Sequence, residues 1–213
     1  AHALGAIRQD GQKVGSSWCA TFSFHPVKLI TTGEGGAIAF DDPVLADRAR
    51  MLRSHGRNVD GEMVALGFNY RMSDINAALG RSQLRRMQEE GWLEKRRALA
   101  MEYVEALWPA ISRGVLTLPE INATCSAWHL FPVLFDSHDT RERAHYELRR
   151  AGYLATVHYP VVPLQHYYVQ RYGYQPGRWP VAEDASSRLL SLPLWQGMPA
   201  DTVERVCEIL EGL

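Results

Sequence analysis

The sequence is poor in lysine and has no long hydrophobic run. Its 23 basic residues include only three lysines, so arginine carries almost all of the positive charge. Charges of the two signs nearly cancel, at a formal net charge of −1, which argues against a nucleic-acid-binding surface or a basic membrane-binding patch. No apolar segment of the sequence is long enough to cross a bilayer.

Cysteine is scarce as well, with three widely separated residues: Cys19, Cys125 and Cys207. An odd number at this spacing argues against a disulfide framework and against a paired-cysteine metal site. We therefore expect a reducing, cytoplasmic setting. The eight histidines do not follow a metal-ligand spacing either, and we predict no metal.

What is present fits a folded globular protein. The 213 residues are 46% hydrophobic and 22% charged, enough for one large domain or two small ones. The opening residues, AHALGA, include no initiator methionine and no signal-peptide pattern. We therefore expect the sequence to be part of a longer chain.

The pattern of apolar residues predicts two regions of different character. The first is expected to hold two strands, at residues 18–24 and 36–40, and three helices, at 43–55, 73–84 and 92–107, the last ended by Pro109. The second reads as a small α+β unit with strands at 127–135 and 154–159 and helices at 138–150, 181–190 and 199–210. The boundary is placed along the long connecting helix, which gives domains 1–95 and 96–213.

One of the rare lysines, Lys28, lies between an apolar strand and a glycine-rich turn, in the stretch FSFHPVKLITTGEGG. Partial desolvation there would favour a neutral amine, which can attack a carbonyl and form a Schiff base. The hydroxyls of Ser23, Thr31 and Thr32 and the amides of the turn are typical phosphate ligands. An aldehyde that carries a phosphate, such as pyridoxal 5′-phosphate (PLP), would suit both. A surface lysine before a flexible loop remains the alternative on spacing alone.

Several long motifs widen the argument beyond Lys28. The stretches AHALGA, FSFHPVK, TTGEGGAIA, LRSHG, GFNYRMSDINAALGRSQL and VHYPVVPLQHYY occur in this order over nearly the whole chain. Together they resemble the DegT/DnrJ/EryC1/StrS family of PLP-dependent nucleotide-sugar aminotransferases. HPVK, VHYPV, YGY and SLPLWQGM are most similar to the branch that makes a UDP-linked 4-amino-4,6-dideoxy-N-acetyl-altrosamine for pseudaminic acid.

The resemblance implies an α/β fold, the PLP-dependent transferase fold type I. This chain would then contain the C-terminal part of the large PLP-binding domain, followed by the small α+β domain. The family's cofactor aspartate, which pairs with the pyridine nitrogen, would come just before Ala1, and neither Asp10 nor Asp41 occupies its position.

Site residues follow from the resemblance position by position. Lys28 matches the Schiff-base lysine, which also moves protons between cofactor and sugar. Ser23 matches a hydroxyl on the cofactor phosphate, and His2 matches the residue beside the ring oxygen. Asn69 matches an asparagine that reaches the partner's cofactor phosphate, which implies a homodimer with composite sites.

Two further residues, His158 and Tyr159, match a segment that lines the sugar pocket, and His25 would steady the loop that carries the lysine. A packing role is an equal alternative for each of them.

The predicted function is therefore transfer of an amino group, from glutamate, to a 4-keto-6-deoxy nucleotide sugar. A dTDP-sugar enzyme with the same residues is a competing prediction. An inactive family remnant, which acts as an oligomerisation or interaction module through the loop around Asn69, is the alternative from another class.

Overall fold

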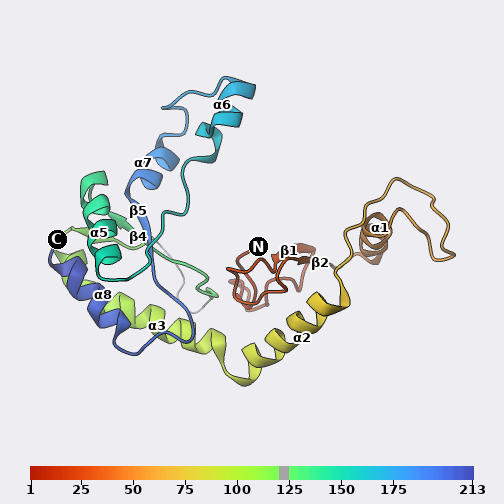
Figure 1. Ribbon diagram of the computed structural model, residues 1–213, viewed down its shortest axis with the longest axis horizontal. Coiled ribbons are helices and arrows are strands. Elements are labelled where there is room, and N and C mark those ends of the chain that lie inside the picture. The colour runs from red at the N-terminus through yellow and green to blue at the C-terminus, as the bar shows by residue number, and fades with distance from the viewer. Residues whose placement is uncertain (120–124) are drawn as a thin grey trace. The chain divides into compact units, whose positions relative to one another are not determined.

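The computed structural model describes residues 1–119 and 125–213 (Figure 1). The chain forms two compact units. Of the described residues, one unit contains 1–94 and 125–129, and the other contains 95–119 and 130–213. The predicted domain division at residue 95 stays a prediction, and the sequence did not indicate that a segment near residue 129 groups with the first unit.

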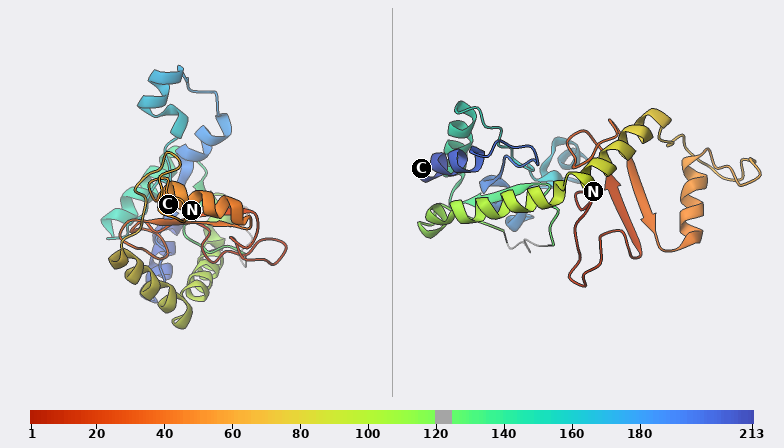
Figure 2. Two further views of the ribbon diagram at one scale, coloured as in Figure 1. Left: turned by 90° about the vertical axis from the view of Figure 1, so that its right-hand side faces the viewer. Right: turned by 90° about the horizontal axis from the view of Figure 1, so that it is seen from below.

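The first unit is built on an antiparallel strand pair, β1 (Cys19–Ser23) and β2 (Gly36–Phe40). Figure 2 shows the two strands running in opposite directions, with α1 beside β2. Both predicted strands are confirmed, the first two residues shorter than expected. Ser23 pairs with Gly36, so the glycine turn and the segment that holds Lys28 both leave the sheet at this end.

Side-chain caps start the two helices of this unit where the sequence predicts. Asp42 accepts a hydrogen bond from the Val44 amide before α1 (Pro43–Arg53). Ser73 accepts one from the Asn76 amide before α2 (Asp74–Glu89). Each cap satisfies an amide that has no partner within the helix.

A small apolar core lies under the chain that follows Lys28. It consists of Leu29, Ile30, Met87 and Trp92, with Leu4, Phe24 and Leu93 packed against it. Ile30 is only 1% exposed. Burial of these side chains fixes the backbone next to the lysine, since each buried aliphatic or aromatic group contributes about 1.5–3 kcal/mol.

Helix α3 (Trp92–Ala106) confirms the predicted connecting helix, but the expected role of Pro109 is wrong. Pro109 lies in the first turn of a further short helix, α4 (Trp108–Ser112). Proline lacks an amide hydrogen, and in a first turn that hydrogen has no intrahelical acceptor. It therefore starts α4, and the helix break falls at Leu107.

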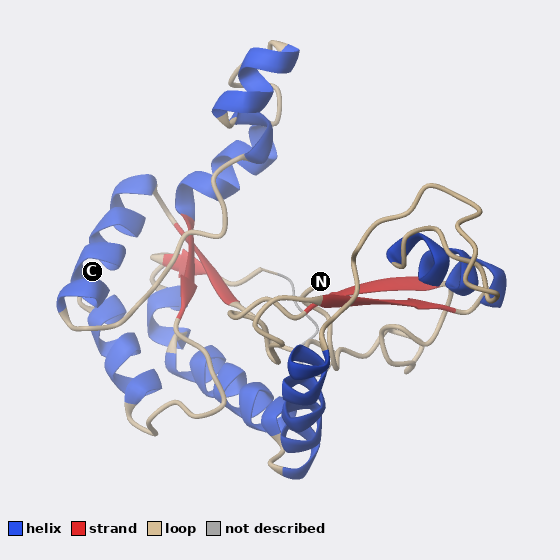
Figure 3. Cartoon of the chain, turned by 45° about the vertical axis from the view of Figure 1, so that its right-hand side comes forward, coloured by secondary structure: helices blue, strands red, loops and turns tan. Residues whose placement is uncertain are grey.

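The second unit has a three-stranded antiparallel sheet in the order β3-β4-β5. Its strands are β3 (Leu116–Thr117), β4 (Phe131–Phe135) and β5 (Leu189–Leu192). Helices α5 (His138–Arg150) and α8 (Thr202–Glu211) pack together, and α5 contacts β4 and β5 (Figure 3). The helix predicted at 138–150 is confirmed residue for residue.

The core of this unit alternates along β4, as expected of a strand with one buried face. Phe131, Val133 and Phe135 are buried, whereas Pro132 and Leu134 are half-buried. Buried Tyr103 from α3 stacks on Phe131 at 4.8 Å between ring centroids and donates its hydroxyl to the Pro193 carbonyl at 2.9 Å.

Several predictions for the second half need correction. The strand expected at 154–159 is not formed, and Thr156 makes only an isolated bridge to Ser191 of β5. The strand expected at 127–135 begins at Phe131, and the helix expected at 181–190 ends at Arg188, before β5. The prediction missed β3, β5, η1 (Val162–Leu164) and α6 (His166–Tyr172), whereas the helix expected at 181–190 is formed as α7 (Pro180–Arg188).

Among the described residues, no helix combines the length and apolarity that a membrane span requires.

Candidate active site

Lys28 is held at the edge of the first unit's core by its own turn. Its amide donates to the His25 carbonyl at 2.9 Å, and the Val27 amide donates to His25 Nδ1 at 3.4 Å. Lys28 is half-buried, and the next residue, Leu29, is buried. The amine is thus carried on a short turn in which both Val27 and Lys28 are hydrogen-bonded to His25.

The Lys28 amine contacts the imidazole of His2, which the resemblance places beside the ring oxygen of the cofactor. Lys28 Nζ and His2 Nε2 are 2.7 Å apart, within hydrogen-bond distance, although 26 residues separate them in the chain. His2 is exposed, and its segment is folded back by hydrogen bonds from the Ala6 amide to the Ala3 carbonyl and from the Val14 amide to the Ala6 carbonyl.

Ser23 lies at the last position of β1, at the start of the same turn. Its side chain is half-buried, and its Oγ accepts a weak hydrogen bond from the His25 amide at 3.4 Å. The hydroxyl hydrogen of Ser23 can still be donated, which is what a phosphate oxygen requires.

The threonines that follow Lys28 are used within the turn itself. Thr31 Oγ1 donates to the Phe24 carbonyl at 3.0 Å and accepts from the Gly33 amide at 2.9 Å, and Thr32 Oγ1 donates to the Glu34 carbonyl at 2.7 Å. These hydroxyls stabilise the shape of the turn, a role that the sequence analysis did not assign to them.

Helix α2 packs against the turn that contains Thr31 and Thr32. Gln83 Oε1 accepts a hydrogen bond from the Thr31 amide at 3.1 Å. A Cβ at Gly80 would lie 2.7 Å from Thr32 Cγ2, so only glycine allows the helix to come this close. Neither contact was predicted, although the motif GFNYRMSDINAALGRSQL includes both Gly80 and Gln83.

Asn69 lies elsewhere in the first unit, on the segment between α1 and α2. It forms a bridge with Ser54, and its Oδ1 accepts from Arg71 Nε at 3.3 Å. It is exposed, and these two contacts tie it to its own segment and to the end of α1. Its expected role across a dimer stays a prediction.

His158 and Tyr159 belong to the second compact unit. His158 Nδ1 lies 3.0 Å from Ser191 Oγ, and the two rings meet edge-on at 4.8 Å between centroids. The Tyr159 carbonyl accepts from Ser186 Oγ at 2.9 Å, while its ring is 55% exposed. The pair is tied to β5 and α7, and its assignment to a sugar pocket stays a prediction.

The two aspartates that were considered for the pyridine nitrogen have local partners. Asp10 Oδ1 accepts from the Gln12 amide at 3.0 Å, and Asp10 also pairs with Arg8 at 2.9 Å. Asp41 Oδ2 accepts from the Trp18 amide. Among the described residues, no group of three His, Cys, Asp or Glu side chains is arranged to hold a metal ion.

One residue beside the lysine was missed altogether. His129 lies 4.2 Å from His2 between ring centroids, at an interplanar angle of 48°. The sequence analysis placed His129 inside a strand, because WHLFPVLF is apolar and β-prone. Only the fold brings its segment to the first unit, where the Ile7 amide donates to the Cys125 carbonyl at 2.8 Å.

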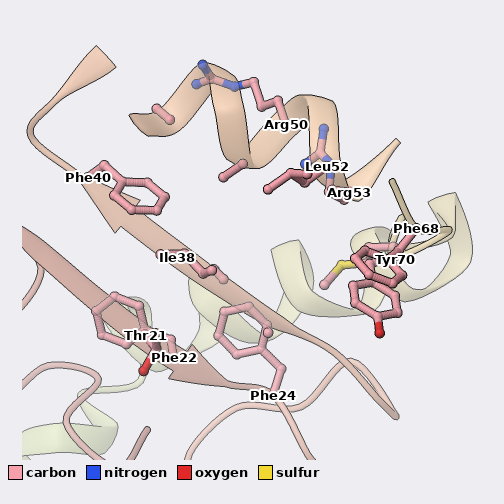
Figure 4. Close-up of a pocket in the computed structure, with 15 residues that line it drawn as sticks. Thr21, Phe22, Phe24, Ile38, Phe40, Arg50, Leu52, Arg53, Phe68 and Tyr70 are labelled. Carbon is pink, nitrogen blue, oxygen red and sulfur yellow. The ribbon is translucent and has the colours of Figure 1, made fainter. Parts of the chain in front are cut away.

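A separate hollow of about 800 Å³ lies on the first unit between the strand pair, α1 and the segment before α2 (Figure 4). Figure 4 shows Phe22 and Phe40 of the strands, Phe24 just after β1, and Phe68 and Tyr70 from the segment before α2. Its lining is mostly apolar, with Arg50 and Arg53 of α1 at one side.

The residues around Lys28 fit PLP. An amine, a neighbouring imidazole and the hydroxyl of Ser23 are the groups that an aldehyde, its ring oxygen and a phosphate need. The amine and the imidazole are already in hydrogen-bond contact, so a proton can pass between Nζ and Nε2 without movement of the backbone.

Residues 1–211 match the model of the DegT/DnrJ/EryC1/StrS aminotransferase family, and the chain belongs to this family. Aminotransferases of this family are PLP-dependent, as the PLP-form and PMP-form structures of Spr1654 from Streptococcus pneumoniae illustrate. PLP is therefore the cofactor of the family to which this chain belongs, as predicted.

Solved structures agree over the whole chain. PseC of Helicobacter pylori, an aminotransferase of pseudaminic acid biosynthesis, matches 99% of the chain at a TM-score of 0.86 and 30% identity. DesV of S. venezuelae matches 95% at 0.84 and 32%, and a family aminotransferase of Brucella abortus matches 100% at 0.85 and 28%. The predicted α/β fold class, that of fold-type-I PLP enzymes, is confirmed. The chain spans 57%, 53% and 55% of these three proteins.

Proposed function

We propose that this chain carries the Schiff-base lysine of a PLP-dependent sugar aminotransferase, with Lys28 as that lysine. The observation that supports this proposal is the 2.7 Å contact between Lys28 Nζ and His2 Nε2, at the end of a turn that begins with Ser23. Arginine, the chain's common cation, could not serve, because its guanidinium keeps its proton at working pH.

The chain's own residues have separate tasks in this proposal. Lys28 Nζ would hold PLP covalently, and as a free amine it would remove a proton from the α-carbon of the amino donor and, in the second half-reaction, deliver one to C4 of the sugar. His2 holds Nζ in place between these steps, and Ser23 Oγ donates to the phosphate. When bound, PLP supplies an electron-withdrawing ring that stabilises negative charge at the reacting carbon.

The substrate is proposed to be a 4-keto-6-deoxy nucleotide sugar, with glutamate as the amino donor. The similarity to PseC and the motifs HPVK and VHYPV favour a UDP-linked hexosamine over a dTDP-linked sugar. His158 and Tyr159 would contact the sugar. Asn69 would reach the phosphate of a second copy, so the proposed active form is a homodimer. Its proposed location is the cytoplasm.

The first test is chemical trapping of the lysine. Purified protein is incubated with PLP, reduced with borohydride and mapped by peptide mass spectrometry. We expect a pyridoxyl group on Lys28 and its loss in Lys28→Arg, with Lys13 and Lys95 as internal controls for nonspecific modification. Equal modification of all three lysines, or none in folded protein, would contradict the assignment. UDP- and dTDP-linked 4-keto sugars, each supplied with glutamate, then separate the two substrate predictions.

A second candidate function, an interaction module without catalysis, has one observation in its favour. The segment before α2 exposes large apolar side chains, with Val59 fully exposed, Leu66 81% and Tyr70 73% exposed. Folded protein that associates through this segment but leaves Lys28 unmodified in the trapping experiment would support it.

A further inference from the structure

Three side chains from distant parts of the sequence meet at one place in the first unit. Lys28 Nζ contacts His2 Nε2 at 2.7 Å, and the His2 ring lies 4.2 Å from the His129 ring. His129 therefore contacts the ring that contacts the amine. The proposed function assigns no role to His129.

His2 needs support from outside its own segment. Residues 1–3 belong to no helix or strand, and His2 is exposed. An imidazole there would sample several rotamers, and only some of them direct Nε2 at the amine. A second ring in contact with it restricts that choice, because aromatic pairs favour particular tilted or stacked arrangements.

His129 is itself well fixed. The two residues before it, Ala127 and Trp128, are each 4% exposed, and the Trp128 amide donates to Ser126 Oγ at 3.0 Å. The Ile7 amide donates to the Cys125 carbonyl at 2.8 Å, so His129 and His2 come from two segments joined by a backbone hydrogen bond. The His129 ring can thus restrict the rotamers of the His2 ring.

We propose that His129 is a positioning residue, which holds the His2 ring so that Nε2 faces the Lys28 amine. The meaning of this contact for catalysis rests on the proposed function, but the coupling itself is a property of the three side chains. Its contribution comes from the flat ring of His129, in contact with the ring of His2, and not from proton transfer by His129.

The test measures the reactivity of Lys28 itself. Competitive acetylation of the whole protein without PLP, read peptide by peptide, gives the pH profile of each lysine, with Lys13 as the internal reference. We expect His2→Ala to change the Lys28 rate about threefold, which corresponds to the loss of one net hydrogen bond. His129→Ala should change it in the same direction by most of that amount.

Two variants separate positioning from other roles. His129→Phe keeps a flat ring and should retain the wild-type Lys28 profile, whereas the double variant His2→Ala with His129→Ala should equal His2→Ala alone. His138→Ala, a change at an exposed histidine of α5, should leave the Lys28 profile unchanged. Thermal melting of each variant shows whether the fold is retained.

The proposal is overturned if His129→Ala leaves Lys28 unchanged in folded protein, if the two alanine effects add, or if His129→Phe behaves like His129→Ala. An unchanged Lys28 profile in His2→Ala also overturns it. Failure of the proposed function gives a different result: no pyridoxyl group on Lys28 in the borohydride experiment, whatever the coupling among the three side chains.

Discussion

At the scale of single residues, the site depends on how the turn after β1 presents Lys28. The amine is useful only where the backbone holds it, and that backbone is fixed by Leu29 and Ile30 below and by the Thr31 and Thr32 hydroxyls within the turn. The glycines after them let the chain reverse towards β2, because they adopt conformations with positive φ that other residues rarely adopt.

Two glycines of this turn give a matched prediction. Gly33 has a φ of 79° with no atom within 4 Å of an added Cβ, whereas at Gly35, with a φ of 152°, the Cβ would lie 2.4 Å from Thr32 Oγ1. We expect Gly33→Ala to cost about 1–2 kcal/mol of unfolding free energy from backbone strain alone. Gly35→Ala should cost more and also lower PLP attachment at Lys28.

Chemical denaturation and borohydride trapping of both variants measure these effects. Equal losses of stability in the two variants would mean that crowding against Thr32 does not matter.

Sequence reasoning found Lys28, Ser23 and His2 through motifs, and the structure brings Lys28 and His2 into contact. It did not find His129, because nothing local to WHLF distinguishes a histidine in a strand from one placed against a distant ring. Such a contact is set by packing between segments 127 residues apart.

At the scale of elements, α2 supports the turn that follows Lys28, and close packing of the two requires a glycine at position 80. A glycine inside a helix normally costs about 1 kcal/mol relative to alanine. Gly80 is buried against Thr32, so replacing it with alanine does not give the usual gain in unfolding free energy.

We predict that Gly80→Ala destabilises the protein by about 1–2 kcal/mol, since an added methyl would overpack Thr32 Cγ2. Thr32→Ser removes that methyl and keeps the hydroxyl, so it should recover part of the stability when combined with Gly80→Ala. Denaturant unfolding of both single variants and the double variant gives the coupling. A more stable Gly80→Ala protein would show that the helix can move away from the turn.

Elements with local signals were predicted well, and those that depend on partners were not. Capping residues and apolar periodicity are local, and α1, α2 and α5 begin where Asp42, Ser73 and Ser137 indicate. The first two residues of β5 were predicted as the end of a helix and the strand was missed, because only its pairing with β4 makes it a strand.

At the scale of the whole molecule, the two units differ in how well they bury their apolar residues. The second has a continuous core of fully buried side chains, including Leu116, Leu148 and Leu190. In the first, Trp18, Leu66 and Ile75 are about four-fifths exposed. Apolar surfaces of this kind bind partners or lead to association in water.

We therefore predict that the 213-residue chain by itself self-associates and binds an apolar fluorescent dye. Leu66→Glu and Ile75→Glu should weaken both effects, because they place charge on this surface. Val181→Glu, at a valine of α7 that is 83% exposed, is the matched control and should have little effect. Light scattering and dye titration measure this, and a dye-free monomer would contradict it.

The sequence by itself determined the family and the starts of most predicted helices and singled out Lys28 as the proposed site lysine, because motifs, caps and periodicity act over a few residues. Only the tertiary structure decided that His129 faces His2, that Thr31 and Thr32 stabilise the turn, and that Gly80 must be small. Those features depend on which distant segments pack together, and burial of apolar side chains from several segments, such as Leu4, Ile30 and Met87, drives such packing.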